Sequence, residues 1–193
     1  MGFTRRQFIR SAGLATLGAA VTNDLSWASG SFWKSNSNTL KVGLIGCGSR
    51  GTGAAEEALN ADSNVVLWAM ADAFSDRLEQ SHAKLKTKLK EKVQVSNDHK
   101  FVGFDAYQKL IDSDVDVVLL AAPPAFRPLH LEAAVNAGKH IFCEKPFAVD
   151  APGLRRVMAA AKKAEEKRLS LVSGFCWRYH LPKRETFKRV LNG

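Results

Sequence analysis

Cysteine is scarce in this sequence, with three residues, Cys47, Cys143 and Cys176, among 193. Their number is odd, they lie far apart, and no two of them form a C-x-x-C pair. This pattern argues against both a disulfide scaffold and a structural zinc site, and we predict no metal site. Because all three cysteines lie in or beside apolar runs, we predict that their thiols are buried.

Long apolar runs are also missing. The run from Phe8 to Val21 contains Arg10 and is shorter than the roughly 20 residues that a membrane-spanning helix needs. No later segment has the length and composition of a membrane span, so we predict that the mature protein is not embedded in a membrane. The hydrophobic content of 46% is sufficient for a packed core.

Acidic residues are too few to balance the basic ones, and the formal net charge is +9. Lysines cluster in the run Lys84–Lys92, "KLKTKLKEK", where Leu85 and Leu89 fall on one face of a helix. The run contains no aromatic residues and matches no motif that reads nucleic acids. We therefore interpret it as a solvated helix face rather than a nucleic-acid surface, and predict no nucleic-acid partner.

The first residues have the form of an export signal. Arg5 and Arg6 precede the short apolar run, and the small residues Ser26 and Ala28 have the spacing of a cleavage site. We predict a signal peptide over residues 1–28. The following stretch, "SGSFWKSNSNT", is rich in Ser and Asn and predicts a linker over residues 29–39.

From residue 40 onward, short β-branched runs alternate with amphipathic stretches. Several of the runs are apolar almost throughout, as in strands that are buried on both faces of a parallel sheet. The predicted strands are 41–46, 64–70, 93–96, 115–122, 140–144 and 170–175, and the predicted helices are about 50–61, 74–91, 104–112, 127–137 and 151–167. This alternation predicts an α/β fold with a doubly wound parallel sheet, whose ligand site lies at the loops that follow the strands.

The loop after the first predicted strand carries the strongest chemical signal. In "VGLIGCGSRGTG", Gly46, Gly48 and Gly51 have the G-x-G-x-x-G spacing. Such glycines allow a tight turn, a close approach of the backbone to a diphosphate, and close packing of helix on strand. The motif follows a strand and opens a helix, which is the context that dinucleotide binding requires.

An acidic residue at the end of the second predicted strand supports this interpretation. Asp72 follows Gly51 by 21 residues and can accept hydrogen bonds from an adenosine ribose. Its charge would repel a 2′-phosphate, which favours NAD and leaves NADP possible, because Arg50 and Arg77 offer compensating charge. The alternative is that Asp72 only caps the next helix.

The later motifs resemble a known family. The segment "AAPPAFRPLHLEAAVNAGKHIFCEKPFAVD", residues 121–150, resembles the Gfo/Idh/MocA oxidoreductases, which show a proline-containing turn, an A-G-K-H stretch and then E-K-P. The segment "GFCWRY", residues 174–179, lies where family members place a substrate-facing segment. The resemblance covers residues 39–193 and implies a Rossmann domain over residues 40–176.

The resemblance implies roles for individual residues. Lys145 would be the catalytic residue, hydrogen-bonding the reacting oxygen of a sugar or polyol substrate and relaying its proton. Arg178 and Tyr179 would face the substrate, whereas His130 and His180 are expected to be ordinary helix residues. The residues predicted to bind the cofactor are Gly46, Cys47, Gly48, Ser49, Arg50, Gly51, Asp72, Ala122, Pro123, Pro124, Glu144 and Lys145.

The resemblance also gives the arginine pair a reason. "TRRQF" resembles a twin-arginine signal, which directs folded proteins, often with cofactor bound, to the twin-arginine translocase. It predicts a periplasmic or otherwise exported protein. A general secretory signal with a chance arginine pair is the alternative.

Full-length relatives continue into a second α/β domain, which contacts substrate and forms homo-oligomers. Here residues 177–193 are expected to be only the beginning of that domain, with Pro182 at the start of its first helix. The leading hypothesis is an NAD(P)-dependent dehydrogenase that lacks most of its substrate domain. The alternatives are a non-catalytic dinucleotide-binding fragment and a reductase of the dihydrodipicolinate-reductase type.

Overall fold

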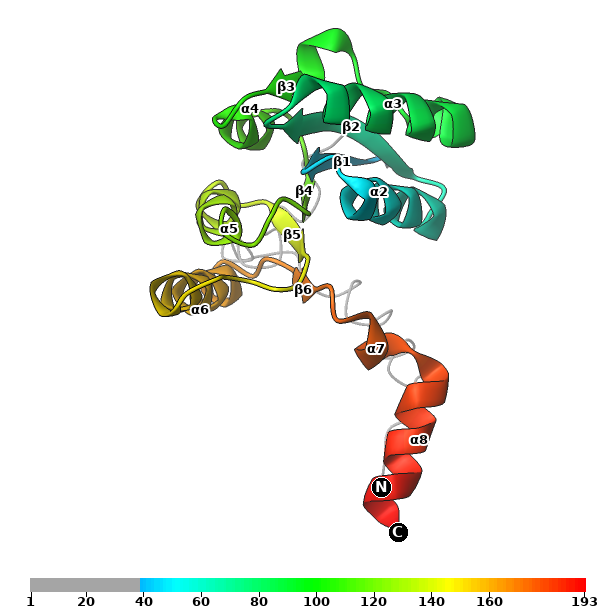
Figure 1. The fold of residues 1–193 in the computed structure, drawn as a ribbon, viewed down its shortest axis with the longest axis vertical. Coiled ribbons are helices and arrows are strands. Elements are labelled where there is room, and N and C mark those ends of the chain that lie inside the picture. Colours follow the sequence, from blue (N-terminus) through cyan, green and yellow to red (C-terminus); the bar gives the residue numbers. More distant parts are fainter. Residues whose placement is uncertain (1–38) are drawn as a thin grey trace, which may run out of the picture. The chain divides into compact units, whose positions relative to one another are not determined.

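The computed structural model describes residues 39–193 and shows a six-stranded parallel sheet (Figure 1). The predicted signal and nearly all of the predicted linker lie outside the described residues. The strands are β1 (Leu40–Ile45), β2 (Val65–Asp72), β3 (Lys100–Val102), β4 (Val117–Leu120), β5 (His140–Cys143) and β6 (Leu171–Ser173). Their spatial order is β3-β2-β1-β4-β5-β6. The prediction of a doubly wound sheet is therefore confirmed, and the order reverses between β1 and β4, where ligands bind in such folds.

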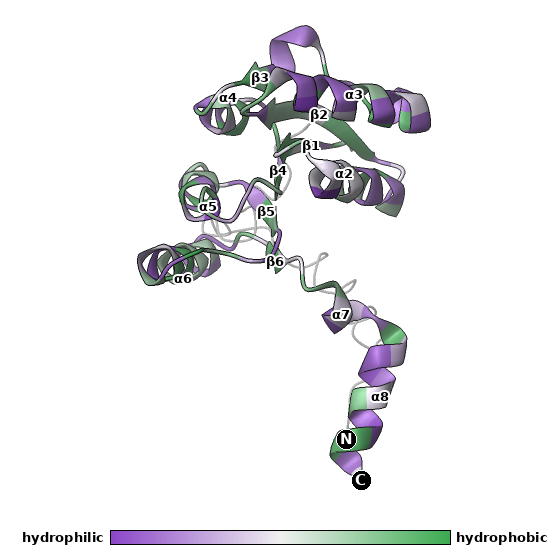
Figure 2. Cartoon of the chain, viewed as in Figure 1, coloured by the Kyte–Doolittle hydropathy of each residue, from purple (hydrophilic) through white to green (hydrophobic). Residues whose placement is uncertain are grey.

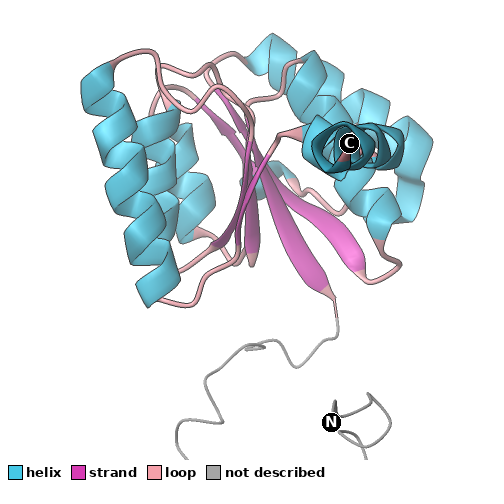
Figure 3. Cartoon of the chain, turned by 90° about the horizontal axis from the view of Figure 1, so that it is seen from below, coloured by secondary structure: helices cyan, strands magenta, loops and turns pink. Residues whose placement is uncertain are grey.

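Helices cover both faces of this sheet (Figure 3). They are α2 (Ser49–Ala61), α3 (Ser75–Leu89), α4 (Ala106–Asp112), α5 (Arg127–Asn136), α6 (Ala151–Glu166), α7 (Cys176–Tyr179) and α8 (Leu181–Asn192). Residues of α2 and α3 share one apolar cluster with the strands, and residues of α4, α5 and α6 share the other. Right-handed crossovers produce this division. The chain first moves from β1 to β2 and β3 on one side of the sheet centre and later from β4 to β5 and β6 on the other side, so the connecting helices lie on opposite faces.

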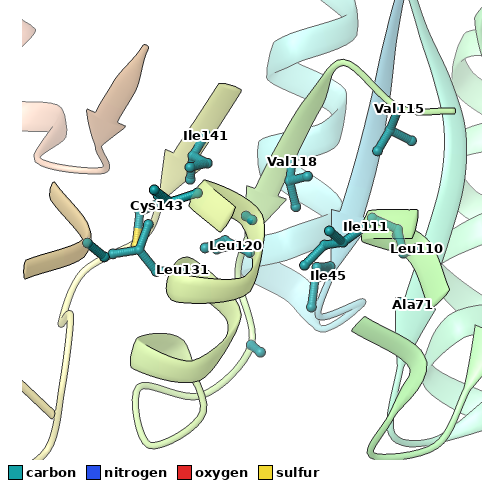
Figure 4. Packing of buried hydrophobic residues seen from close by; sticks show 14 of the residues in the cluster. Ile45, Ala71, Leu110, Ile111, Val115, Val118, Leu120, Leu131, Ile141 and Cys143 are labelled. Atoms are coloured by element: carbon teal, nitrogen blue, oxygen red, sulfur yellow. The ribbon is translucent and has the colours of Figure 1, made fainter. Parts of the chain in front are cut away.

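The two clusters are the core of the domain. On one side Leu44 of β1 and Leu67 of β2 are fully buried against α2 and α3. On the other side Leu120 of β4 is fully buried beside Leu131 and Ile141, as Figure 4 shows. Strand β2 is hydrophobic over most of its length, as expected for a strand covered on both faces (Figure 2).

The prediction of a strand at 93–96 is wrong. The third strand of the sheet is β3, and Val93 forms only an isolated bridge with Leu67. Val93 is nevertheless 1% exposed and belongs to the core. The valine pattern of this segment therefore reflects burial against α3 rather than continuous pairing with a neighbouring strand. Two short 3-10 turns, Lys90–Lys92 and Asn97–His99, lie between α3 and β3.

The lysine-rich run forms the end of α3 and the turn that follows it. Leu85 is fully buried, as the predicted face requires. Lys86 donates from Nζ to the carbonyl oxygen of Val93 at 2.8 Å, and Lys88 pairs with Glu56 of α2 at 3.0 Å. These lysines hold α3 to neighbouring segments, which agrees with a solvated helix face.

The described chain ends in two helices that follow β6. Pro182 lies in the first turn of α8, as predicted, and no residue of α8 is buried within the described chain. Large apolar side chains are exposed there, among them Phe187 and Leu191. Within residues 39–193, none of the helices combines the length and apolar character needed to cross a bilayer.

Candidate functional site

A cleft of about 1110 Å³ lies at the carboxyl ends of the parallel strands. It is large enough for a dinucleotide, since ligand pockets commonly measure about 300 to 1000 Å³. Nine of the predicted cofactor residues line it, namely Gly46, Gly48, Arg50, Asp72, Ala122, Pro123, Pro124, Glu144 and Lys145. The crossovers thus bring residues from the loops after β1, β2, β4 and β5 to one cleft.

The three glycines of the loop have different surroundings: a side chain would clash with the backbone at Gly46 and Gly51 but not at Gly48. Gly46 has a φ of +97°, and a Cβ there would lie 2.4 Å from the amide nitrogen of Ala122. A Cβ on Gly51 would lie 1.8 Å from the carbonyl oxygen of Gly46. A Cβ on Gly48 would meet no atom within 4 Å. The fold itself therefore requires Gly46 and Gly51, whereas the space beside Gly48 lies open toward the cleft.

This geometry suits an anionic ligand. Gly48 is the N-cap of α2 and supplies no capping side chain. The first amide groups of a helix lack partners within the helix and lie at the positive end of its dipole. Diphosphate groups bind at such termini, so the loop and the first turn of α2, which includes Ser49, fit the diphosphate of a dinucleotide.

Asp72 lies against the same loop. Its Oδ2 accepts a hydrogen bond from the amide of Cys47 at 2.6 Å, and its Oδ1 accepts one from the amide of Phe74 at 3.0 Å. The carboxylate is therefore held at the cleft wall by two backbone donors. The Cys47 thiol is buried, and this burial, with the charge of Asp72 nearby, raises its pKa. Cys47 does not line the cleft, and its amide is already used by Asp72, so its part is to hold that carboxylate in place.

Glu144 is a buried carboxylate, 4% exposed, at the end of β5. Arg50 reaches it from α2 and pairs with its Oε1 through Nε at 2.6 Å. The amide of Lys145 donates to its Oε2 at 3.2 Å, and a Cβ on Gly174 would lie 2.8 Å from that oxygen. Arg50 also pairs with Glu57 at 3.2 Å, and the two carboxylates together raise its pKa. The cleft is therefore spanned by an ion pair from α2 to the residue before Lys145.

Lys145 follows Glu144 at the mouth of β5. It is exposed and lines the cleft, and the Lys145–Pro146 peptide bond is cis. The salt bridges found within residues 39–193 leave Lys145 out, so its ammonium group is available to a ligand.

Aromatic residues of α4, α5 and the segments just before these helices form another wall of the cleft, and no motif in the sequence predicted it. Tyr107 stacks on His130 with ring centroids 4.3 Å apart, and Phe126 stacks on the same imidazole at 6.2 Å. Phe104 approaches Phe126 at 6.1 Å. Phe126 and His130 are four residues apart, but their contacts with Phe104 and Tyr107 join two different crossovers and form only in the folded chain.

His130 is 7% exposed, and its Nδ1 has no hydrogen-bond partner among the described residues. Burial, followed by the positive charge of Arg127, lowers its pKa to about 4. The imidazole is therefore neutral at physiological pH, which fits its interpretation as a helix residue.

This burial makes stability depend on pH. Between pH 6.5 and pH 4 the unfolded chain binds a proton at His130 that the folded chain excludes, so stability falls as the pH decreases. We expect the free energy of unfolding to drop by roughly 2 to 3 kcal/mol more than in a His130→Phe variant. Urea denaturation between pH 6.5 and pH 4 measures this free energy. The same pH dependence in the His130→Phe variant and the unaltered chain would contradict a lowered pKa of His130.

Other predicted residues lie away from the cleft wall. Arg178 and Tyr179 lie on α7, where the guanidinium of Arg178 packs over the ring of Phe175 at 5.6 Å, and neither lines the cleft. His180 caps α8 by accepting a hydrogen bond at Nδ1 from the amide of Lys183.

The prediction that all three cysteines are buried is wrong for Cys176, which is exposed because it follows the last strand and lines the cleft.

Comparison with known proteins defines the class. Residues 40–171 match the GFO_IDH_MocA family, described as an oxidoreductase family with an NAD-binding Rossmann fold. The chain therefore belongs to this family, as the E-K-P segment suggested.

The similar proteins include dehydrogenases and a ketoreductase. The chain is 30% identical over 154 residues to myo-inositol 2-dehydrogenase of Thermotoga maritima, covering 80% of this chain and 41% of the relative. The solved myo-inositol 2-dehydrogenase of Lactobacillus plantarum matches with a TM-score of 0.62 and 29% identity over 80% of this chain and 42% of that one. A 3-ketoreductase of Actinomadura kijaniata, solved with NADP and TDP-benzene, matches with a TM-score of 0.60 and 26% identity over 80% of this chain and 43% of that one. The chain thus spans about two fifths of the length of these relatives.

Proposed function

We propose that this chain is the nucleotide-binding part of an NAD-dependent dehydrogenase that acts on a polyol or sugar alcohol. The observation that carries the proposal is that the glycine loop, Asp72, Glu144 and Lys145 open onto one cleft. The names of the inositol dehydrogenases among the relatives support a polyol as the substrate.

The residues fit the cofactor in three places. The amides around Gly48 and the first turn of α2 would hold the diphosphate, and Asp72 would accept hydrogen bonds from the adenosine ribose. Glu144 and the turn at Pro123 and Pro124 would shape the half of the cleft that holds the nicotinamide. When bound, NAD supplies the hydride acceptor.

The protein's own task is to orient the alcohol and to take its proton. Lys145 is exposed at the cleft beside the buried carboxylate of Glu144. Its Nζ would donate a hydrogen bond to the reacting oxygen when protonated and would accept the hydroxyl proton when neutral. Whether Arg178 and Tyr179 contact the substrate stays a prediction.

Fluorescence titration with NADH and NADPH tests the proposal. We expect saturable binding of NADH by this chain in the micromolar to millimolar range, and oxidation of an inositol or a related polyol with NAD by a protein that also carries the proposed substrate domain. Absence of binding by either nucleotide would contradict the proposal. Binding without turnover of any polyol or sugar, in a protein that also carries the proposed substrate domain, would instead favour a non-catalytic dinucleotide-binding module.

Asp72 is expected to set the preference between the two nucleotides. Replacing it in Asp72→Ser removes the carboxylate that would repel a 2′-phosphate, while Arg77 remains at the cleft. We expect the ratio of NADPH to NADH affinity to rise about tenfold or more, equivalent to about 1.4 kcal/mol. Asp76→Ser, which removes a neighbouring exposed carboxylate on α3, is the control and should leave the ratio unchanged. An unchanged ratio in Asp72→Ser would show that other groups decide selectivity.

We also propose that residues 1–28 are a twin-arginine signal, that residues 29–39 are a linker, and that residues 177–193 begin a substrate and oligomerisation domain. The arginine pair and the family membership support the first part, because a protein that binds its cofactor before export must cross the membrane folded. Replacing Arg5 and Arg6 together by lysine should abolish export of a fused reporter. Continued export would indicate the general secretory route.

A further inference from the structure

Arg127 is the most deeply buried positive charge that lines the cleft. It is the first residue of α5 and is 3% exposed. Its guanidinium donates hydrogen bonds to two main-chain carbonyl oxygens, from Nη2 to Ala122 and from Nη1 to Pro146. These two acceptors belong to different loops, one after β4 and one after β5.

The charge of Arg127 is not balanced by an ion pair within residues 39–193. Its Nε has no hydrogen-bond partner among these residues, and burial lowers its pKa. The carboxylate of Glu144 acts on Arg127 only at a distance. A buried cation without a direct ion pair is costly, and an apolar residue of similar volume would generally serve stability as well or better. Core stability alone therefore does not explain an arginine at this position.

The sequence of the two loops supplies a reason. The main-chain hydrogen bonds between them end where the amide of Glu144 donates to the carbonyl of Leu120 at 3.0 Å. Beyond that point Pro123, Pro124 and Pro146 have no amide hydrogen to donate. The fork of the guanidinium provides the two missing donors and continues the connection between the loops past the end of the sheet.

We propose that Arg127 is a positioning residue that holds the Lys145–Pro146 segment against the Ala122–Pro124 segment and so places the ammonium group of Lys145 in the cleft. The carbonyl that it binds belongs to the residue immediately after Lys145, so a shift of this loop moves the lysine directly. The proposal rests on the proposed function, because a fixed Lys145 matters only where it handles the proton of a substrate.

The test compares Arg127→Met and Arg127→Lys with the unaltered chain, with kcat measured in a protein that also carries the proposed substrate domain. In Arg127→Met we expect kcat for polyol oxidation to fall about 100-fold, since a misplacement of about 1 Å can cost that much. The dissociation constant of NADH should change less than threefold. Hydrogen exchange should accelerate in peptides covering residues 121–127 and 143–149 and stay unchanged in β1 and β2. Arg127→Lys supplies one donor group in place of the two of the guanidinium. Its kcat and exchange rates should lie between those of Arg127→Met and the unaltered chain. Arg156→Met, which removes an exposed arginine paired with Glu132, is the control and should leave all three quantities unchanged.

A rescue experiment separates positioning from a general loss of packing. Adding guanidinium at millimolar concentration to Arg127→Gly should recover part of the activity and of the exchange protection, whereas it should not help Lys145→Ala. Unaltered exchange in both loops of Arg127→Met, or equal acceleration over the whole sheet, would overturn the proposal while leaving NADH binding by the unaltered chain intact. Failure of the unaltered chain to bind NADH would instead overturn the proposed function, and this inference with it.

Discussion

Lys145→Ala is expected to lower polyol oxidation about 1000-fold while leaving NADH affinity within threefold, because general acid–base groups contribute about 10² to 10⁴ in rate. The side chain is exposed at the cleft, so its removal leaves no buried cavity and no unpaired partner. The carboxylate beside it keeps its pairing with Arg50. The loss should therefore fall on kcat rather than on cofactor binding or folding.

Lys145→Arg sharpens this prediction. Arginine keeps the positive charge but does not release its proton at accessible pH, so it cannot relay the proton of the alcohol. A loss as large as that in Lys145→Ala would show that the proton matters, whereas near-normal turnover would show that charge alone suffices. The control is Lys109→Ala, which removes an exposed lysine paired with Asp105 on α4 and should have no effect. Unchanged turnover in Lys145→Ala would remove this residue from the mechanism.

Gly51→Ala is expected to destabilise the domain by about 3 kcal/mol and to abolish NADH binding. A Cβ at this position would lie 1.8 Å from the carbonyl oxygen of Gly46, which is backbone and cannot move away as a flexible side chain could. The first turn of α2 would have to separate from the loop, and the diphosphate site would be lost. Urea denaturation and NADH titration measure the two effects.

Two neighbouring glycines provide matched variants. Gly48→Ala meets no atom within 4 Å, so its stability should change by less than about 0.5 kcal/mol. Its methyl group nevertheless projects into the open space where the diphosphate would lie, and NADH affinity should fall about tenfold or more, that is by at least about 1.4 kcal/mol. Gly53→Ala has only Arg50 Nη1 nearby, at 3.7 Å, and should stabilise α2 by about 0.5 to 1 kcal/mol. Equal NADH affinity in Gly48→Ala and the unaltered chain would argue that no ligand approaches this loop closely.

Much of the fold was predictable because the signals are local. A strand that is covered on both faces needs a continuous apolar run, and runs such as "VVLL" of β4 cannot be placed at the surface without loss of hydrophobic free energy. The glycine spacing was equally informative, since the φ of +97° at Gly46 and the contact of Gly51 with the carbonyl oxygen of Gly46 both arise within the loop. The third strand was misassigned for the same reason, because the apolar residue Val93 is buried but hardly paired, and local pattern does not separate burial from pairing.

The sequence by itself determined the class of fold, the glycine loop and the positions of Asp72 and Lys145 at strand ends, because each of these depends on residues that are close together along the chain. Only the tertiary structure decided that Arg50 pairs with Glu144, 94 residues away, and that Arg127 joins the loops after β4 and β5. The physical reason is that these contacts are made across crossovers, where the packing of helices on the sheet, and no feature of the local sequence, sets which side chains meet.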